Sequence, residues 1–288
     1  MKTAILLLGV STLLPAESEQ TRGIVPEEVI KARPKRKTQV ATVLPKYQAV
    51  GPTTGKLEGD AAFRQVGVTI WLLRPARQDD NGARILVQDE GGAVEWVPER
   101  VSSTKRLHAG DRVRLTIESP GTGYLYVIDR ERYATGQRGS PYLIFPTTRT
   151  RGGDNRVSAG KLIDIPAQTD RPNFFRLTQS RPDQVEEELT VLLATNPIAG
   201  LELGLRAMPL AAEVAEQWEK KWGTRTANVF ELSGGDGKAW TKAEQEAAAN
   251  STRILNQEDP PPQTVFRVLP GADKESFLIK VRLRYSAE

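Results

Sequence analysis

An alternation of apolar and polar side chains with a period of two begins near residue 63 and returns through most of the chain. In RQVGVTIWLLR, residues 64–74, Val66, Val68 and Ile70 share one face, because successive side chains of a strand point to opposite sides. Similar short segments follow, separated by the turn-forming residues Gly, Pro, Asn and Asp. The pattern predicts a mainly β fold, an antiparallel β-sandwich or a partly open barrel.

The clearest alternation lies in RVRLTIE, residues 112–118, where Val, Leu and Ile alternate with Arg, Thr and Glu. This segment predicts a strand with one buried face and one solvated face. A Pro-Gly turn at 120–121 leads to GYLYVID, residues 123–129, so we expect these two strands to pair antiparallel. We also expect a hairpin between residues 84–88 and 93–97 around a Gly-Gly turn.

Two segments in the C-terminal half have helical periodicity. In residues 209–223, Leu210, Val214 and Trp218 recur every four residues and form one apolar stripe. Residues 241–255 open with Thr and, three positions later, Glu, which is the spacing of a capping box. We expect both helices to pack on the sheets, since an apolar sheet face needs a cover.

The N-terminus has the pattern of an export signal. Lys2 precedes the apolar run TAILLLGVSTLL, residues 3–14, which is shorter than the roughly 20 residues needed to span a bilayer. We therefore predict a signal peptide over residues 1–16, or alternatively an uncleaved anchor, and a periplasmic or extracellular location. Residues 17–60 are predicted to be a flexible, basic, Pro-containing linker, and residues 61–288 a single domain.

Composition excludes several classes of site. The 288 residues contain no Cys and one His, His108, which excludes disulfides, thiolate zinc sites and clusters of His ligands within one chain. Residues 59–288 hold 31 basic and 31 acidic side chains, so the positive excess lies before them. A folded body without net charge gives no support for nucleic-acid binding.

Catalytic, metal-binding and phosphate-binding motifs are also missing from the sequence. His108 has only Asp111 nearby, at the spacing of a turn, and no GxSxG or Walker motif is present. The Asp- and Asn-containing turns at 79–82 and 152–155 lack the ligand spacing of a calcium loop. We predict no cofactor and no metal; the best candidates for a carboxylate pair are Asp129 and Glu131.

The stretch FPTTRTRGGDNR, residues 145–156, is the strongest candidate for binding. Glycines at 152 and 153 permit positive φ angles, and three guanidinium groups could grip a carboxylate or phosphate. Alternatively, the acidic and amide side chains make local turns and the arginines pair with nearby acids. The candidate binding residues are Arg149, Arg151, Asp154, Asn155 and Arg156.

Three motifs in order, LHAGDRVRLTIESPGTGYLYVID, YLIFP and NRVSAGKLIDIP, resemble the bacterial domain-of-unknown-function family numbered 4384. The resemblance covers roughly residues 107–194. That family occurs in bacterial proteins, sometimes joined to caspase-like peptidases or protein kinases, and no activity is established for it. The resemblance implies a non-catalytic module.

These patterns together favour an exported, non-catalytic bacterial β-sandwich module that binds or scaffolds in the cell envelope. The expected partner is an envelope protein or an anionic polymer, with membrane contact only through an uncleaved N-terminal segment. The alternative is a hydrolase of an envelope polymer that uses the carboxylates of Asp129 and Glu131.

Overall fold

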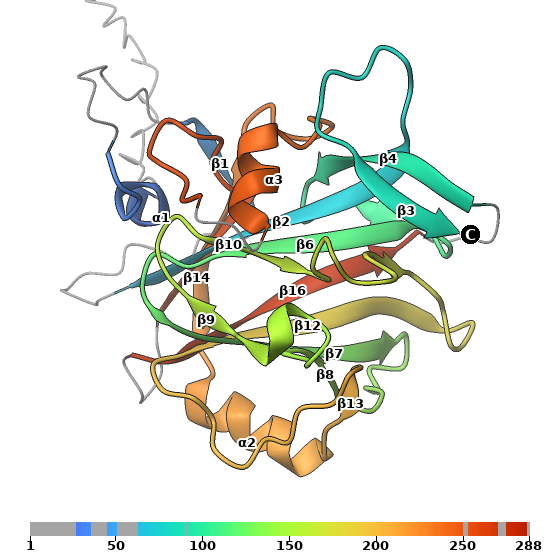
Figure 1. Ribbon diagram of the computed structural model, residues 1–288. Coiled ribbons are helices and arrows are strands. Elements are labelled where there is room, and N and C mark those ends of the chain that lie inside the picture. Colours follow the sequence, from blue (N-terminus) through green and yellow to red (C-terminus); the bar gives the residue numbers. More distant parts are fainter. Residues whose placement is uncertain are drawn as a thin grey trace, which may run out of the picture.

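Two sheets stack face to face, with two short helices on the outer side of one sheet and a longer helix on the outer side of the other (Figure 1). The computed structural model describes residues 27–35, 45–50, 63–89, 92–249, 253–269 and 275–286. The mainly β architecture with antiparallel sheets that the period-two pattern predicts is confirmed.

The first sheet, sheet A, follows the order β1-β14-β15-β2-β4-β3, and β2 also pairs with β6, which carries β10 and β11. Its strands are β1 (Tyr47–Val50), β2 (Arg64–Pro75), β3 (Ile85–Asp89), β4 (Gly92–Val101), β6 (Arg112–Glu118), β10 (Leu162–Ile165), β11 (Phe175–Arg176), β14 (Arg225–Leu232) and β15 (Thr264–Leu269). The pairing of β3 with β4 confirms the predicted hairpin.

The second sheet, sheet B, follows the order β13-β8-β7-β12-β16-β5, and β9 pairs with β7. Its strands are β5 (Arg106–Leu107), β7 (Gly123–Tyr133), β8 (Tyr142–Phe145), β9 (Arg156–Val157), β12 (Gln184–Ala194), β13 (Met208–Pro209) and β16 (Phe277–Tyr285). The helices are α1 (Glu27–Lys31), α2 (Ala212–Trp222) and α3 (Lys242–Ala248), with a short 3-10 turn at Arg151–Gly153.

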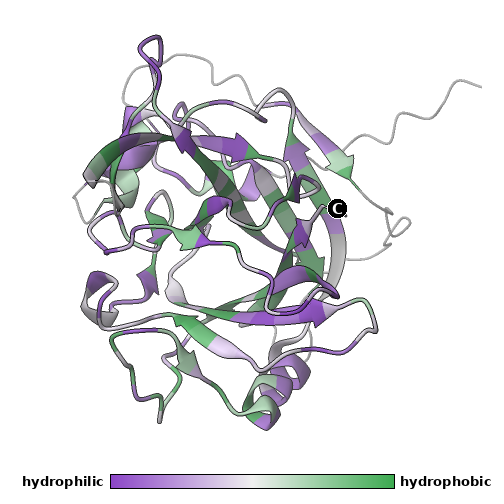
Figure 2. Cartoon of the chain, turned by 90° about the vertical axis from the view of Figure 1, so that its right-hand side faces the viewer, coloured by the Kyte–Doolittle hydropathy of each residue, from purple (hydrophilic) through white to green (hydrophobic). Residues whose placement is uncertain are grey.

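The three largest clusters of buried apolar side chains form three layers, and a small fourth cluster packs Val29 of α1 against Phe230 and Val265 of sheet A. The central layer lies between the sheets and includes Leu115 of β6 and Val127 of β7. A second layer packs Trp71 and Trp240 with α3 on the outer face of sheet A, and a third packs Trp218 of α2 on the outer face of sheet B. Hydrophobic and hydrophilic residues therefore alternate along the strands of both sheets (Figure 2).

The expected pairing of β6 with β7 is wrong. β6 lies in sheet A and pairs with β2, β10 and β11, whereas β7 lies in sheet B and pairs with β8, β9 and β12. The Pro-Gly segment between them therefore crosses from one sheet to the other. The physical reason is that both strands turn their apolar faces to the same core, which places them opposite each other rather than side by side.

The expectation of a solvated face on β6 is also wrong, because every residue of this strand is buried. The guanidinium of Arg114 lies 3.1 Å from Asp164 and above the ring of Trp240. Thr116 accepts a hydrogen bond from the indole N–H of Trp71 and donates one to Asp164. Polar side chains are tolerated here because neighbours on the outer side of the sheet satisfy them.

The expectation of an unstructured linker over 17–60 is corrected for the residues that are described. Helix α1 buries Val29 and Ile30, and the side chain of Arg33 behind it is buried. Strand β1 pairs with β14, and the hydroxyl of Tyr47 donates to the carbonyl of Pro262. Sequence periodicity could not show this, because both elements are too short. Residues 17–26, 36–44 and 51–60 lie outside the described residues, as does the predicted signal peptide.

The two expected helices are present, with different lengths. Helix α2 lies inside the predicted 209–223 range, and the capping box of Thr241 and Glu244 opens α3 as predicted. Helix α3 ends at Ala248 instead of reaching 255, since the following residue is extended and the backbone N–H of Leu255 donates to the carbonyl of Gly160. No helix in the described part of the chain is long and apolar enough to cross a membrane.

Candidate functional site: an acidic cavity between the sheets

The inner faces of two strands in sheet B change from apolar to acidic toward one end. On β7, Val127 lies in the central core, and Asp129 and Glu131 occupy the next inward positions. On β12, Leu189 is in the core and Glu187 is the next inward residue. The antiparallel register places Glu187 opposite Glu131, and Leu189 opposite Asp129. Period-two geometry therefore brings three carboxyl groups to one end of the sandwich interior.

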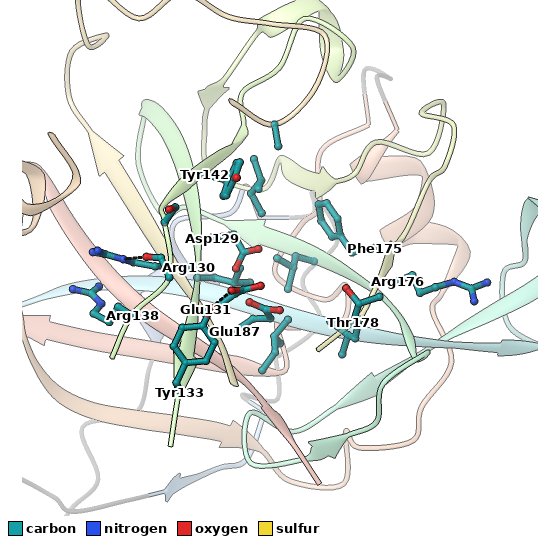
Figure 3. A pocket seen from close by; sticks show the side chains of 18 residues that line it. Asp129, Arg130, Glu131, Tyr133, Arg138, Tyr142, Phe175, Arg176, Thr178 and Glu187 are labelled. Atoms are coloured by element: carbon teal, nitrogen blue, oxygen red, sulfur yellow. Dashed lines mark hydrogen bonds between the residues drawn. The ribbon is translucent and has the colours of Figure 1, made fainter. Parts of the chain in front are cut away.

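These carboxyl groups line a cavity of about 650 Å³ between the two sheets (Figure 3). Strands β7, β8 and β12 of sheet B contribute one side, and β6, β11 and the residues after β11 contribute the other. The apolar part of the lining consists of Leu115, Ile144, Phe175, Leu177, Leu189 and Leu283. Tyr142 also lines the cavity and is 45 % exposed, which places an aromatic ring where the cavity meets solvent.

Of the six carboxylate oxygens of Asp129, Glu131 and Glu187, two accept hydrogen bonds from described side chains and two are buried without a donor among the described residues. One oxygen of Glu187 accepts hydrogen bonds from Gln184, at 2.7 Å, and from the hydroxyl of Tyr285, at 3.2 Å. Glu131 accepts a hydrogen bond from the hydroxyl group of Tyr133. By contrast, Asp129 Oδ1 and Glu187 Oε2 are shielded from solvent and have no hydrogen-bond partner among the described residues. Buried acceptors without donors destabilise a fold unless a proton or ligand satisfies them.

Asp129 and Glu187 are close enough to share a proton, which would supply a donor within the pair. Burial raises the pKa of Asp129 to about 6, and its side chain is within hydrogen-bonding reach of Glu187. Burial and the neighbouring charge of Asp129 raise the pKa of Glu187 to about 8. Two carboxyl groups within hydrogen-bonding reach of each other cannot both ionise freely, because their negative charges repel. The pair therefore holds one proton near neutral pH.

The arginines around the cavity do not neutralise this pair. Arg130 and Arg176 extend away from the carboxyl groups (Figure 3). The Nε–H of Arg130 donates to the carbonyl of Gly139 at 2.7 Å, and Arg138 pairs with Glu188 on the opposite side of sheet B. The cavity therefore has an acidic end and an apolar end.

Both sequence-predicted carboxylates line the cavity, but the partner of Asp129 in direct contact is Glu187. Sequence reasoning missed Glu187. Its signal was available in EELTVLLAT, because Glu187 has the same period-two parity as the core residues Leu189 and Val191. An acidic residue at an inward position indicates either a buried partner or a cavity.

The arginine loop is placed elsewhere, and none of its five predicted residues lines the cavity. Asn155 is buried and its amide donates to the carbonyl of Leu125. Asp154 lies 2.9 Å from Arg156 and 3.5 Å from Arg151, and Arg149 donates to a backbone carbonyl.

Gly152 and Gly153 in the same loop adopt positive φ angles. The local hydrogen bonds and ion pairs favour the interpretation of this loop as a structural turn. Its binding role stays a prediction.

The remaining candidates provide no reactive group. His108 is an exposed side chain whose Nδ1 lies 3.8 Å from Asp111, within the turn that precedes β6. Within the described ranges, no group of three or more His, Cys, Asp or Glu side chains is arranged to hold a metal ion.

Comparison with family models, with curated proteins and with solved structures found no match to this chain. The resemblance to the family numbered 4384 therefore stays a prediction.

Proposed function

We propose that the protein is an exported, non-catalytic module of a bacterial cell envelope that binds a ligand in the cavity between its sheets. One observation carries this proposal: Asp129 and Glu187 line the cavity, and Asp129 Oδ1 and Glu187 Oε2 are buried without a hydrogen-bond donor among the described residues. A cationic group with several N–H donors would satisfy both oxygens and replace the shared proton.

The lining defines the chemistry of the ligand. Beyond the carboxyl pair, part of the wall is apolar, with Phe175 from sheet A and Ile144 and Leu189 from sheet B, and part is polar or charged, including Glu131, Arg130 and Thr178. A cavity of about 650 Å³ lies in the size range of small-molecule pockets. We therefore propose a ligand with a primary ammonium group at one end and a short aliphatic or aromatic body at the other.

Binding is favoured over hydrolysis by the separation of the acids. A glycosidase pair flanks the scissile bond and needs about 5 to 10 Å between the carboxyl groups. Asp129 and Glu187 instead lie within hydrogen-bonding reach of each other. Such a pair leaves no room for a sugar between its members.

Calorimetric titration with hexylamine and benzylamine tests the proposal, with hexanol and benzyl alcohol as neutral analogues of the same shape. We expect the amines to bind and the alcohols to bind at least tenfold more weakly, because only an ammonium group supplies charged donors. The heat of amine binding should depend on the ionisation enthalpy of the buffer, since the ligand displaces the shared proton.

Two variants provide the matched comparison. Asp129→Asn combined with Glu187→Gln keeps the shape of the cavity and removes its charge, so amine binding should be lost. Glu202→Gln removes an exposed carboxylate that does not line the cavity and should bind as wild type does. Equal affinity for amines and alcohols in the wild type would overturn the proposal.

The shared proton supports one second candidate, a hydrolase with a carboxyl dyad. In such a dyad the ionised carboxylate accepts a proton from water as the water oxygen bonds to the substrate carbon, and the protonated carboxyl gives its proton to the leaving group. This candidate uses Asp129 and Glu187 rather than Asp129 and Glu131. Release of product from peptidoglycan or a peptide library, abolished by Asp129→Asn, would establish it and displace the binding proposal.

The envelope location is proposed from the apolar run at residues 3–14. Mass spectrometry of the protein from its native cells should find an N-terminus near Glu17. A mature chain that begins at Met1 and fractionates with the cytoplasm would reject this part of the proposal and leave the cavity argument intact.

A further inference from the structure

The outer face of sheet B is divided into an apolar half and a charged half. On β7, Tyr126 and Ile128 pack under α2 with Trp218. The next two outward residues of that strand are Arg130 and Arg132. The same change occurs on β12 and β16, so the charged half is a continuous surface across three neighbouring strands.

The register arranges this surface as rows of cation, anion and cation. Glu186 on the central strand β12 lies opposite Arg132 of β7 on one side and Arg284 of β16 on the other. In the next row, Glu188 lies between Arg130 and Arg282. Residues directly opposite each other on paired strands share one face, so each carboxylate is flanked by two guanidinium groups.

Exposure differs between the two kinds of charge. The side chains of Glu186 and Glu188 are 9 % and 1 % exposed, whereas those of Arg282 and Arg284 are 44 % and 34 % exposed. The carboxylates therefore lie at the base of the surface and the cations form its outer layer. We name this surface the basic face; it consists of Arg130, Arg132, Arg138, Lys280, Arg282, Arg284, Glu186, Glu188 and Glu219.

The basic face has more positive than negative charges, because its six cations surround three carboxylates and Glu216 of α2 adds a fourth near Arg130. Burial by itself would raise the pKa of Glu219, but hydrogen bonds from Arg138 and Lys280 outweigh it and lower the pKa to about 2. Lys280 and the neighbouring arginines likewise lower the pKa of Glu188. Glu188 and Glu219 therefore stay ionised, and with Glu216 counted the six cations exceed the four carboxylates by two charges.

We propose that the basic face binds a linear anionic polymer that runs along the strands of sheet B. Lys280, Arg282 and Arg284 project at every second residue of β16, a spacing of about 7 Å. The cations of β7 and β16 flank β12 and lie about 10 Å apart across it. Two parallel lines of cations fit a chain with regularly repeated phosphate or carboxylate groups.

This site is distinct from the Asp129–Glu187 pair, although Arg130 and Arg138 also line the cavity. The inward residues of β7 and β12 line the cavity, and the outward residues of the same strands form the basic face. Polymer binding therefore requires neither an amine ligand nor the Asp129–Glu187 pair, and each proposal can fail without the other.

Fluorescence anisotropy with labelled inorganic polyphosphate tests the proposal, and poly-glutamate provides the carboxylate arm. We expect saturable binding that weakens steeply as salt is raised, because bound counterions are released on association. Arg282→Glu combined with Arg284→Glu should lower the affinity at least tenfold. If the charge-reversal variant does not fold, Arg282→Gln combined with Arg284→Gln replaces it. We expect a smaller loss of affinity for the polymer in that variant.

A matched control separates the face from overall charge. Arg77→Glu with Lys242→Glu makes the same change in net charge at two exposed positions associated with sheet A, and should change affinity less than twofold. Equal losses in both double variants would overturn the proposal, as would absence of binding by the wild type. Binding to vesicles containing anionic phospholipid but to neither polymer would assign the face to a membrane surface and also overturn it.

Discussion

Arg33 and Glu118 are 85 positions apart in the sequence and form a bidentate ion pair in which both side chains are buried, with N–O distances of 2.6 and 2.7 Å. The other donors of Arg33 reach the carbonyls of Asn256, Asp259 and Pro260. All five N–H donors of the Arg33 guanidinium are thus hydrogen-bonded within the folded domain. This explains why the polar residue at the end of β6 can be buried.

Removal of Arg33 should destabilise the whole domain. We expect Arg33→Ala to lower the free energy of unfolding by about 3 to 5 kcal/mol, because Glu118 would be left buried without its counterion. Urea denaturation followed by tryptophan fluorescence measures this. Lys31→Ala, which removes only an exposed pair with Glu27, should cost less than about 0.5 kcal/mol. A similar small loss for Arg33→Ala would contradict the anchoring role.

The carboxyl pair predicts a loss of stability at alkaline pH. The folded-state pKa values of Asp129 and Glu187, about 6 and about 8, exceed those of unfolded carboxyl groups, so the folded protein holds the proton more tightly. The contribution of these two carboxyl groups to the free energy of unfolding is complete at pH values below about 4, and it is lost as the pH rises through about 6 to 8.

Glu187→Gln should remove most of this dependence, because an amide has no proton to lose in this range. We expect the variant to be more stable than the wild type at about pH 9, by about 1 to 3 kcal/mol. Thermal melting across the pH range, with Glu202→Gln as control, gives the comparison. Parallel pH profiles for Glu187→Gln and the wild type would refute the shared proton.

The arginine loop predicts a contrast between two neighbouring residues. Arg149 is exposed, whereas the side chain of Arg151 is only 9 % exposed and its backbone has a φ of 54°. We expect Arg149→Ala to leave the melting temperature unchanged and Arg151→Ala to lower it by a few degrees. If Arg151→Ala leaves melting unchanged but weakens partner capture, the loop is a binding element, as the sequence alone suggests.

The capping box of α3 predicts two different costs. The hydroxyl of Thr241 accepts the backbone N–H of Glu244, so Thr241→Ala should cost about 1 kcal/mol. Glu244 is buried and also pairs with Arg100, so Glu244→Ala should cost about 3 to 5 kcal/mol. Denaturant unfolding of both variants checks the order, and equal costs would show that the ion pair contributes nothing beyond the cap.

Much of the candidate site follows from strand parity. Asp129 and Glu131 are inward on β7 by the same alternation that places Val127 in the core. Glu187 could have been found by the same rule on β12. Their proximity could not be predicted, because it requires β7 and β12 to be neighbours. The paired residues Tyr133 and Gln184 at the ends of these strands are 51 positions apart in the sequence.

The sequence by itself determined the local features: the strands, the capping box of α3, and the lack of cysteine or clustered histidine chemistry. Each of these depends on backbone geometry within a few residues, or on composition. Tertiary structure alone decided that β6 and β7 lie in different sheets, that Glu118 is buried against Arg33, and that Asp129 meets Glu187. Those outcomes depend on contacts between distant segments, because the free energy of burying a charge is set by the partner that tertiary packing brings to it.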